Sequence, residues 1–96
     1  MHNALDIMAP RGTPVLSADA GTLLKFHNSV PGGLTAYASD PTRHFIFLYG
    51  HLDSYNPRLK EGQALARGDT IGFVGSTGNA AAAGPHLHFA ITRNTD

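Results

Sequence analysis

The chain has 96 residues, of which 42% are hydrophobic, and it contains no cysteine. This length suits one domain with a single core, and the lack of cysteine excludes disulfides and thiolate ligands, so any metal must be bound by His, Asp or Glu. The formal net charge is zero with neutral His, which argues against a nucleic-acid-binding surface, and no apolar run approaches the ~20 residues of a membrane span.

Glycine and proline recur at short intervals, and short apolar or alternating runs lie between them. Such runs are typical of β-strands, and no stretch of ten or more residues has the 3.6-residue period of a helix. Ala80 to Ala83 favours helix but is too short to form one alone. We therefore predict one compact all-β domain of about seven short, mostly antiparallel strands. Besides an N-terminal strand, the predicted strands are residues 13–17, 21–26, 34–38, 45–49, 70–74 and 87–91.

The first candidate site residues are His2 and Asp6, which lie four residues apart in the N-terminal strand. Even spacings in a strand place side chains on one face. An imidazole and a carboxylate on one face form a plausible half of a zinc site. A surface His and a turn Asp would give the same pattern, so this pair alone does not identify a metal site.

A second candidate is the triplet His86-Leu87-His88, which follows a Gly-Pro pair and leads into an apolar strand. Its two imidazoles point to the same face of the strand. Burying them side by side without partners is costly, which favours a metal-binding or catalytic role. The alternative is an edge strand that carries two incidental histidines.

A third candidate is His51, which follows the apolar run 45–49. A strand that is apolar on both faces is typical of the centre of a sheet. We predict that His51 lies just beyond the end of this strand, where its side chain can enter a site from a rigid base. An exposed loop position is the alternative.

The other titratable residues have no partner at a spacing that would indicate a metal-binding or catalytic site. We interpret His27 and His44 as surface or rim residues. Four aspartates have turn-like contexts, in which Asp accepts hydrogen bonds from local backbone N–H groups; they are Asp19, Asp40, Asp53 and Asp69. Glu61 is the only Glu, and the His-Glu-x-x-His motif of many metalloproteases is absent.

Together, the three candidates resemble the motif set of LytM-type peptidases of family M23, in the same order along the chain. The motifs are His2-x-x-x-Asp6, Tyr49-Gly50-His51-Leu52 and Gly84-Pro85-His86-Leu87-His88-Phe89. The turn and strand at 9–15 and the glycine-rich segment 62–78 also resemble the family pattern, so the resemblance covers nearly the whole chain.

The resemblance implies a LytM-like β-sandwich over residues 1–96, with one zinc ion bound by His2, Asp6 and His88. It implies that His51 and His86 form the catalytic pair. The implied substrate is the peptide stem or cross-bridge of bacterial peptidoglycan, and the implied location is the cell envelope. Two imidazoles and one carboxylate leave zinc with an open position for water.

The sequence departs from the family pattern in two ways. Ala4 stands where members usually carry Gly, and the strands that precede the first His in the family are missing. Met1-His2-Asn3 also begins without the order of residues seen in a signal peptide. We therefore expect the chain to lack upstream strands of its domain.

Two other kinds of protein are alternatives to an enzyme. Degenerate LytM-type domains activate other wall hydrolases, but they lose metal or catalytic positions, and all five are present here. A phosphocarrier would use two facing histidines such as His51 and His86, without needing Asp6. A biotinyl or lipoyl carrier needs a modifiable Lys at a hairpin tip, and Lys25 and Lys60 lack that context.

Overall fold

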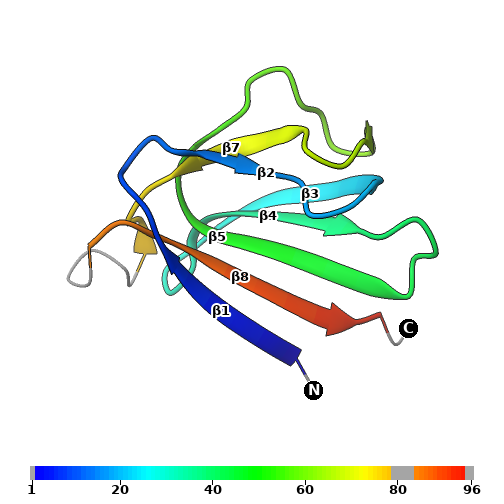
Figure 1. The fold of residues 1–96 in the computed structure, drawn as a ribbon, viewed down its shortest axis with the longest axis horizontal. Helices are drawn as coiled ribbons and strands as arrows, with labels where there is room; N and C mark the ends of the chain where they lie inside the picture. The colour runs from blue at the N-terminus through cyan, green and yellow to red at the C-terminus, as the bar shows by residue number, and fades with distance from the viewer. Residues whose placement is uncertain (1, 79–83, 95–96) are drawn as a thin grey trace.

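The computed structural model describes residues 2–78 and 84–94, with side chains described from residue 4 onward. It confirms the all-β fold (Figure 1). The alanine run 80–83 lies outside the described residues. The strands are β1 (His2–Met8), β2 (Pro14–Leu16), β3 (Gly21–Ser29), β4 (Gly33–Ser39), β5 (Phe45–Tyr55), β6 (Ala64–Leu65), β7 (Thr70–Val74) and β8 (His86–Arg93).

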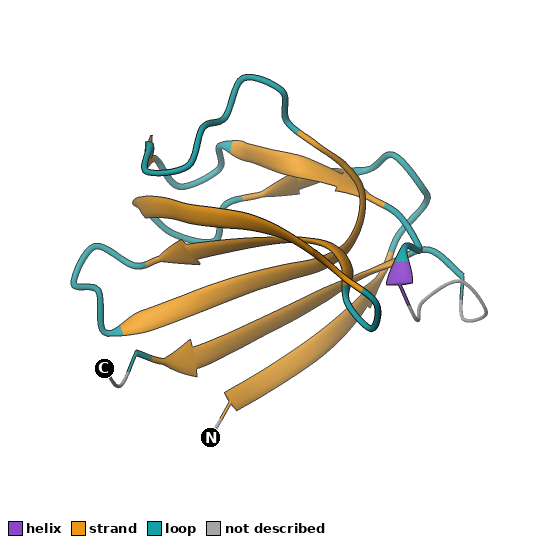
Figure 2. Cartoon of the chain, turned by 180° about the vertical axis from the view of Figure 1, so that it is seen from behind, coloured by secondary structure: helices purple, strands orange, loops and turns teal. Residues whose placement is uncertain are grey.

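All of these strands belong to one antiparallel sheet rather than to two separate sheets. Six of them follow the order β1-β8-β5-β4-β3-β6, while β7 pairs with β5 and carries β2. Strand β5 pairs first with β8, up to Gly50 opposite His88, and then with β7, from Leu52 opposite Val74. Figure 2 shows the same sheet from behind, with its strands joined by turns and loops. The described residues contain no helix long and apolar enough to cross a lipid bilayer.

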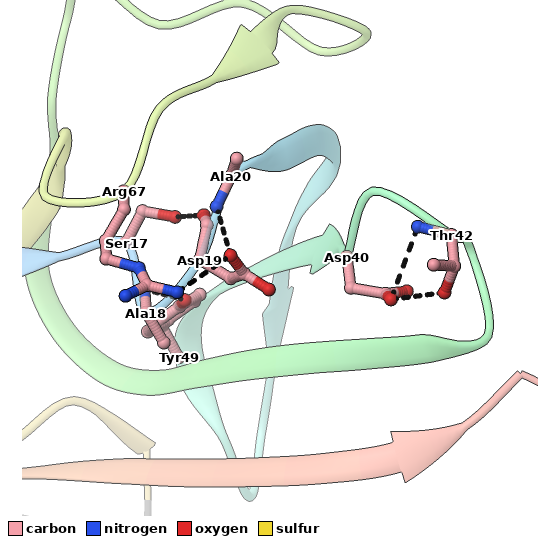
Figure 3. A network of polar contacts seen from close by, with 8 residues as sticks. All are labelled: Ser17, Ala18, Asp19, Ala20, Asp40, Thr42, Tyr49 and Arg67. Carbon is pink, nitrogen blue, oxygen red and sulfur yellow. Dashed lines mark hydrogen bonds and ion pairs between the residues drawn. The ribbon is translucent and has the colours of Figure 1, made fainter.

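The hydrophobic core joins both parts of this sheet. Side chains of β2 and β7 pack with those of β3, β4 and β5, and the largest fully buried ones are Tyr49, Leu23, Leu52 and Ile71. The buried Tyr49 hydroxyl accepts a hydrogen bond from the backbone N–H of Ala18 at 3.0 Å (Figure 3). Because a buried phenolate is poorly solvated, burial raises the pKa of Tyr49. Since β5 lies between β8 and β4 in the sheet, the apolar run at 45–49 forms a central strand, as predicted.

Two details of the strand prediction are wrong. The two-residue β6 was missed, because so short a strand leaves no alternating pattern in the sequence. His51 does not lie beyond the end of its strand but within β5. Its φ of 61° bends the strand at the point where β5 changes partner from β8 to β7. A positive φ is uncommon for a residue other than glycine, so nothing in the sequence indicated this bend.

Three of the four aspartates assigned to turns do hold turns together. The Asp40 carboxylate accepts a hydrogen bond from the Thr42 hydroxyl (Figure 3) and another from the backbone N–H of Phe45, and these bonds lower the pKa of Asp40. Asp19 accepts from the backbone N–H of Ala20, and Asp69 from that of Ala66. Asp53 is the exception, because it lies in β5 and pairs with Arg11 at 3.2 Å.

Candidate functional site

The functional candidates meet on the face of the sheet that points away from the core. The register places Asp6 of β1 opposite His88 of β8, and His88 opposite Gly50 of β5. A hollow of about 560 Å³ lies over these strands and contains four of the five predicted site residues. Its lining is Asp6, Ser29, Pro31, Gly32, Thr35, Tyr37, Leu48, Gly50, His51, His86 and His88.

Asp6 and the two histidines of β8 form one cluster. The Asp6 carboxylate lies 2.9 Å from His88 Nδ1 and 3.8 Å from His86 Nε2. The two imidazoles share a face because side chains alternate along a strand, which confirms the parity argument for this triplet. The hydrogen bond from His88 lowers the pKa of the Asp6 carboxyl, so this group is held in its ionised form.

His51 completes the cluster from β5. Its ring centroid lies 5.0 Å from that of His86 and 5.8 Å from that of His88. The His86 side chain is only 8% exposed, whereas that of His88 is 35% exposed. Three imidazoles and one carboxylate thus line the same hollow, with His86 the most enclosed of the four.

Backbone carbonyl groups fix the tautomers of His51 and His86. Nδ1 of His51 lies 2.7 Å from the carbonyl oxygen of Thr77, and Nδ1 of His86 lies 3.0 Å from that of Gly84. A carbonyl oxygen only accepts, so each neutral ring donates its Nδ1–H and carries its lone pair on Nε2. Both rings therefore offer a basic nitrogen while their orientation is fixed from the opposite side.

The turn between β3 and β4 locks the segment that holds His51. The backbone N–H of His51 donates to Gly32 at 3.0 Å, and the Thr77 hydroxyl accepts from the N–H of Leu34 at 3.0 Å. Gly33 has φ +65°, and a Cβ added there would lie 2.3 Å from the Thr77 hydroxyl oxygen. Only glycine fits so close an approach at this φ.

Sequence reasoning missed this supporting role of Thr77. The segment 75–78 was noted as part of the family pattern, but its residues carried no predicted function. Its sequence is a possible signal, since two glycines flank a Ser-Thr pair. The contact that matters is made by a backbone carbonyl group, which every residue has, so residue identity alone could not reveal it.

For the predicted ligand His2, the structure describes the backbone but not the side chain. Its backbone lies in β1 opposite Thr92, and its side chain lies outside the described part of the structure. Among the described side chains, no three converge as a complete metal-binding group. His27 and His44 are exposed and line no part of the hollow, which agrees with their interpretation as surface residues.

Comparison with known proteins gives the family. The family model described as Peptidase family M23 matches residues 1–96. The chain belongs to this peptidase family. It is 37% identical over 95 residues to the DD-carboxypeptidase/endopeptidase Mpg of Neisseria meningitidis, and the match covers 98% of the chain and 20% of Mpg.

Solved structures of M23 proteins agree with this assignment. The catalytic domain of lysostaphin from Staphylococcus simulans superposes with a TM-score of 0.89 at 32% identity, covering 100% of this chain and 70% of that domain. A zinc-containing peptidase from Vibrio cholerae superposes with a TM-score of 0.81 at 31% identity, covering 92% of this chain and 26% of that protein. The M23 chain thus has the lysostaphin-like fold, while it spans 20% of the length of its curated relative Mpg.

The Asp6–His88 pair of this M23 chain fits a zinc ion. Its carboxylate oxygen and imidazole nitrogen face each other at 2.9 Å. Ligands about 2.0–2.1 Å from a tetrahedral zinc ion lie about 3.3 Å from one another, so a small shift would let an ion replace the shared proton. Nitrogen and oxygen donors of this kind suit zinc.

Proposed function

We propose that the chain is a zinc-dependent endopeptidase domain that hydrolyses peptide bonds in the stems or cross-bridges of bacterial peptidoglycan. The observation that carries this proposal is the pairing of His51 and His86 beside Asp6 and His88 in one hollow. The relative Mpg is named a DD-carboxypeptidase/endopeptidase, which supports endopeptidase activity. The Vibrio cholerae relative ShyC, 33% identical over 93 residues, is named a peptidoglycan DD-endopeptidase, which supports this class of substrate. Such a substrate places the protein in the bacterial cell envelope.

The proposed zinc ligands are Asp6, His88 and His2. A zinc ion supplies a Lewis acid that polarises a carbonyl group and activates a water molecule. The backbone sets a condition for His2, because the four residue steps of regular strand from His2 to Asp6 span about 13 Å. His2 and Asp6 can bind one ion only if the chain between them shortens, as it does at a β-bulge.

The proposed catalytic pair is His51 and His86. With Nδ1 engaged by a carbonyl group, each ring can accept a proton at Nε2 and pass it on. A neutral ring takes a proton from the attacking water. A protonated ring donates to the developing negative charge on the carbonyl oxygen or to the leaving amine. The carbonyl groups of Thr77 and Gly84 keep both rings oriented during this exchange.

The proposal is tested by measuring zinc content and muropeptide products for the same set of variants. We expect one zinc ion per chain and cleavage of purified sacculi. Asp6→Ala should lose zinc, whereas His51→Ala and His86→Ala should keep it and lose about 10²-fold or more of the hydrolysis rate. The matched control is His44→Ala, since His44 is an exposed histidine outside the hollow.

Three results would contradict parts of this assignment. If Asp6→Ala binds zinc as tightly as the parent, Asp6 is not a ligand. If His51→Ala or His86→Ala loses zinc, that residue is a ligand rather than a proton carrier. If His2→Ala alone keeps full zinc affinity, the third ligand lies elsewhere.

The same measurements separate the enzyme from its alternatives. A chain that binds zinc but releases no muropeptide, and that stimulates another wall hydrolase, is an activator. A chain that accepts a phosphoryl group on His51 or His86 from a phosphorylated donor in the absence of zinc is a phosphocarrier. We expect neither result.

A further inference from the structure

A β-bulge in β3 places Lys25 on the face of the sheet that carries the hollow. Leu23 and Phe26 both face the core although they are three residues apart, because the register shifts between Leu23 and Lys25. The extra residue of the bulge leaves Lys25 opposite Tyr37, on the face that points away from the core. Without the bulge, strict alternation would place Lys25 on the core face. Bulges are frequent next to functional sites, where they redirect a side chain.

The ammonium group of Lys25 lies against the ring of Tyr37. Its Nζ is 5.1 Å from the ring centroid, a distance at which the ring attracts a cation. Tyr37 also lines the hollow, and the register continues from Tyr37 to Leu48 in β5. Leu48 lies two residues before Gly50 in β5, and Gly50 lies opposite His88. Lys25, Tyr37 and Leu48 thus form a row across the sheet beside the row that contains the site.

Lys25 has no ion-pair partner within the described part of the chain. The carboxylate of Glu61, which approaches the same strand, accepts a hydrogen bond from the backbone N–H of Phe26 at 2.8 Å instead. Among the residues that the structure describes, Asp6 is the only acidic one that lines the hollow, and it lies on β1, at the opposite edge of this face. The face therefore has a positive charge at its β3 side, with the apolar surface of Tyr37 and Leu48 between the two ends.

We propose that Lys25, held against Tyr37, binds a carboxylate of the substrate peptide. This inference rests on the proposed peptidase function and adds a substrate preference to it. Three strand spacings separate β8 from β3, which amounts to about 14 Å. An extended chain advances ~3.3–3.6 Å per residue, so the carboxylate lies about four residues from the scissile bond. The preferred substrate is an extended acidic peptide whose carboxyl group at this position is free rather than amidated.

The test compares two forms of one substrate with parent and variant proteins. Cross-linked muropeptides are prepared from sacculi and used either directly or after their carboxyl groups have been converted to amides. We expect the parent to prefer the native form, and Lys25→Gln to lower that preference by up to about fivefold, the upper end of the range of an exposed ion pair. The change should appear in KM, because Lys25 is remote from the reacting atoms. Lys25→Arg should keep the preference.

The matched control is Lys60→Gln, which removes an exposed lysine that does not line the hollow. Dissociation constants of both labelled forms, measured by fluorescence anisotropy, provide a second readout that does not require cleavage. Equal preferences in the parent, Lys25→Gln and Lys60→Gln would overturn the inference and leave the peptidase function intact. If the parent cleaves neither form, the peptidase function fails, and the dissociation constants still decide whether Lys25 distinguishes the two forms.

Discussion

Replacing Gly33 by Ala should destabilise the protein far more than the same replacement at Gly12. Both glycines have positive φ, +65° at Gly33 and +87° at Gly12. They differ in their surroundings, because a Cβ at Gly33 would lie 2.3 Å from Oγ1 and 2.4 Å from the carbonyl carbon of Thr77, whereas a Cβ at Gly12 would have no neighbour within 4 Å. The pair therefore separates backbone strain from a steric clash.

The expected magnitudes follow from these two contributions. The left-handed conformation costs an Ala residue about 1–2 kcal/mol at either position. The clash at Gly33 adds about 1–3 kcal/mol, the usual effect of overpacking. For a domain of this size, each kcal/mol lowers Tm by about 4–8 °C. We therefore expect the Tm of Gly33→Ala to lie between about 4 and 24 °C below that of Gly12→Ala.

The assay is thermal unfolding monitored by circular dichroism. Muropeptide hydrolysis is measured in parallel, at a temperature below the lower of the two variants' Tm values. A shift of Thr77 would weaken the 2.7 Å hydrogen bond that orients His51, so Gly33→Ala should also lose hydrolysis while Gly12→Ala retains it. Equal losses of Tm in the two variants would refute the reasoning, since they would mean that the turn and the 77–78 segment do not meet closely.

Two further predictions concern buried and turn hydrogen bonds. Tyr49→Phe removes the acceptor of the Ala18 N–H, so it should destabilise the chain by about 1–3 kcal/mol in urea unfolding, and an unchanged midpoint would contradict this role of the hydroxyl. Asp40→Asn should lower Tm at pH 7, because the pKa of Asp40 is lowered by its hydrogen bonds in the folded chain. The stabilisation is fully present above the unfolded value of about 3.9 and is lost as the pH falls through the lowered folded value, so the two proteins should converge in strong acid. A Tm difference that is the same at pH 7 and pH 2 would exclude this linkage.

Local patterns predicted much of the site. The shared face of His86 and His88 followed from strand alternation, which is a property of the backbone and does not depend on the partner strand. The apolar run at 45–49 likewise indicated a central strand, which β5 confirmed. The position of His51 was predicted wrongly, since a bend at positive φ in a residue other than glycine has no sequence signal.

The orientation of Lys25 illustrates the same limit. Counting from Leu23 with strict alternation, Lys25 would belong to the core face, and only the bulge between them reverses this. Where a bulge falls depends on how the two strands pair, and pairing is governed by side chains on both strands. The sequence of β3 alone therefore cannot reveal which face of the sheet Lys25 occupies.

The sequence by itself determined the all-β class, the motif set and the residues able to bind a metal or carry a proton, because residue chemistry and strand alternation are local properties. Tertiary structure decided which of these residues meet. Asp6 and His88 are 82 positions apart in the chain, and they touch only because β1 and β8 are neighbours in register. The described side chains of β1, residues 4–8, are all exposed, so backbone pairing with β8 rather than burial defines this register. A shift of one residue would turn Asp6 and every other side chain of β1 to the opposite face.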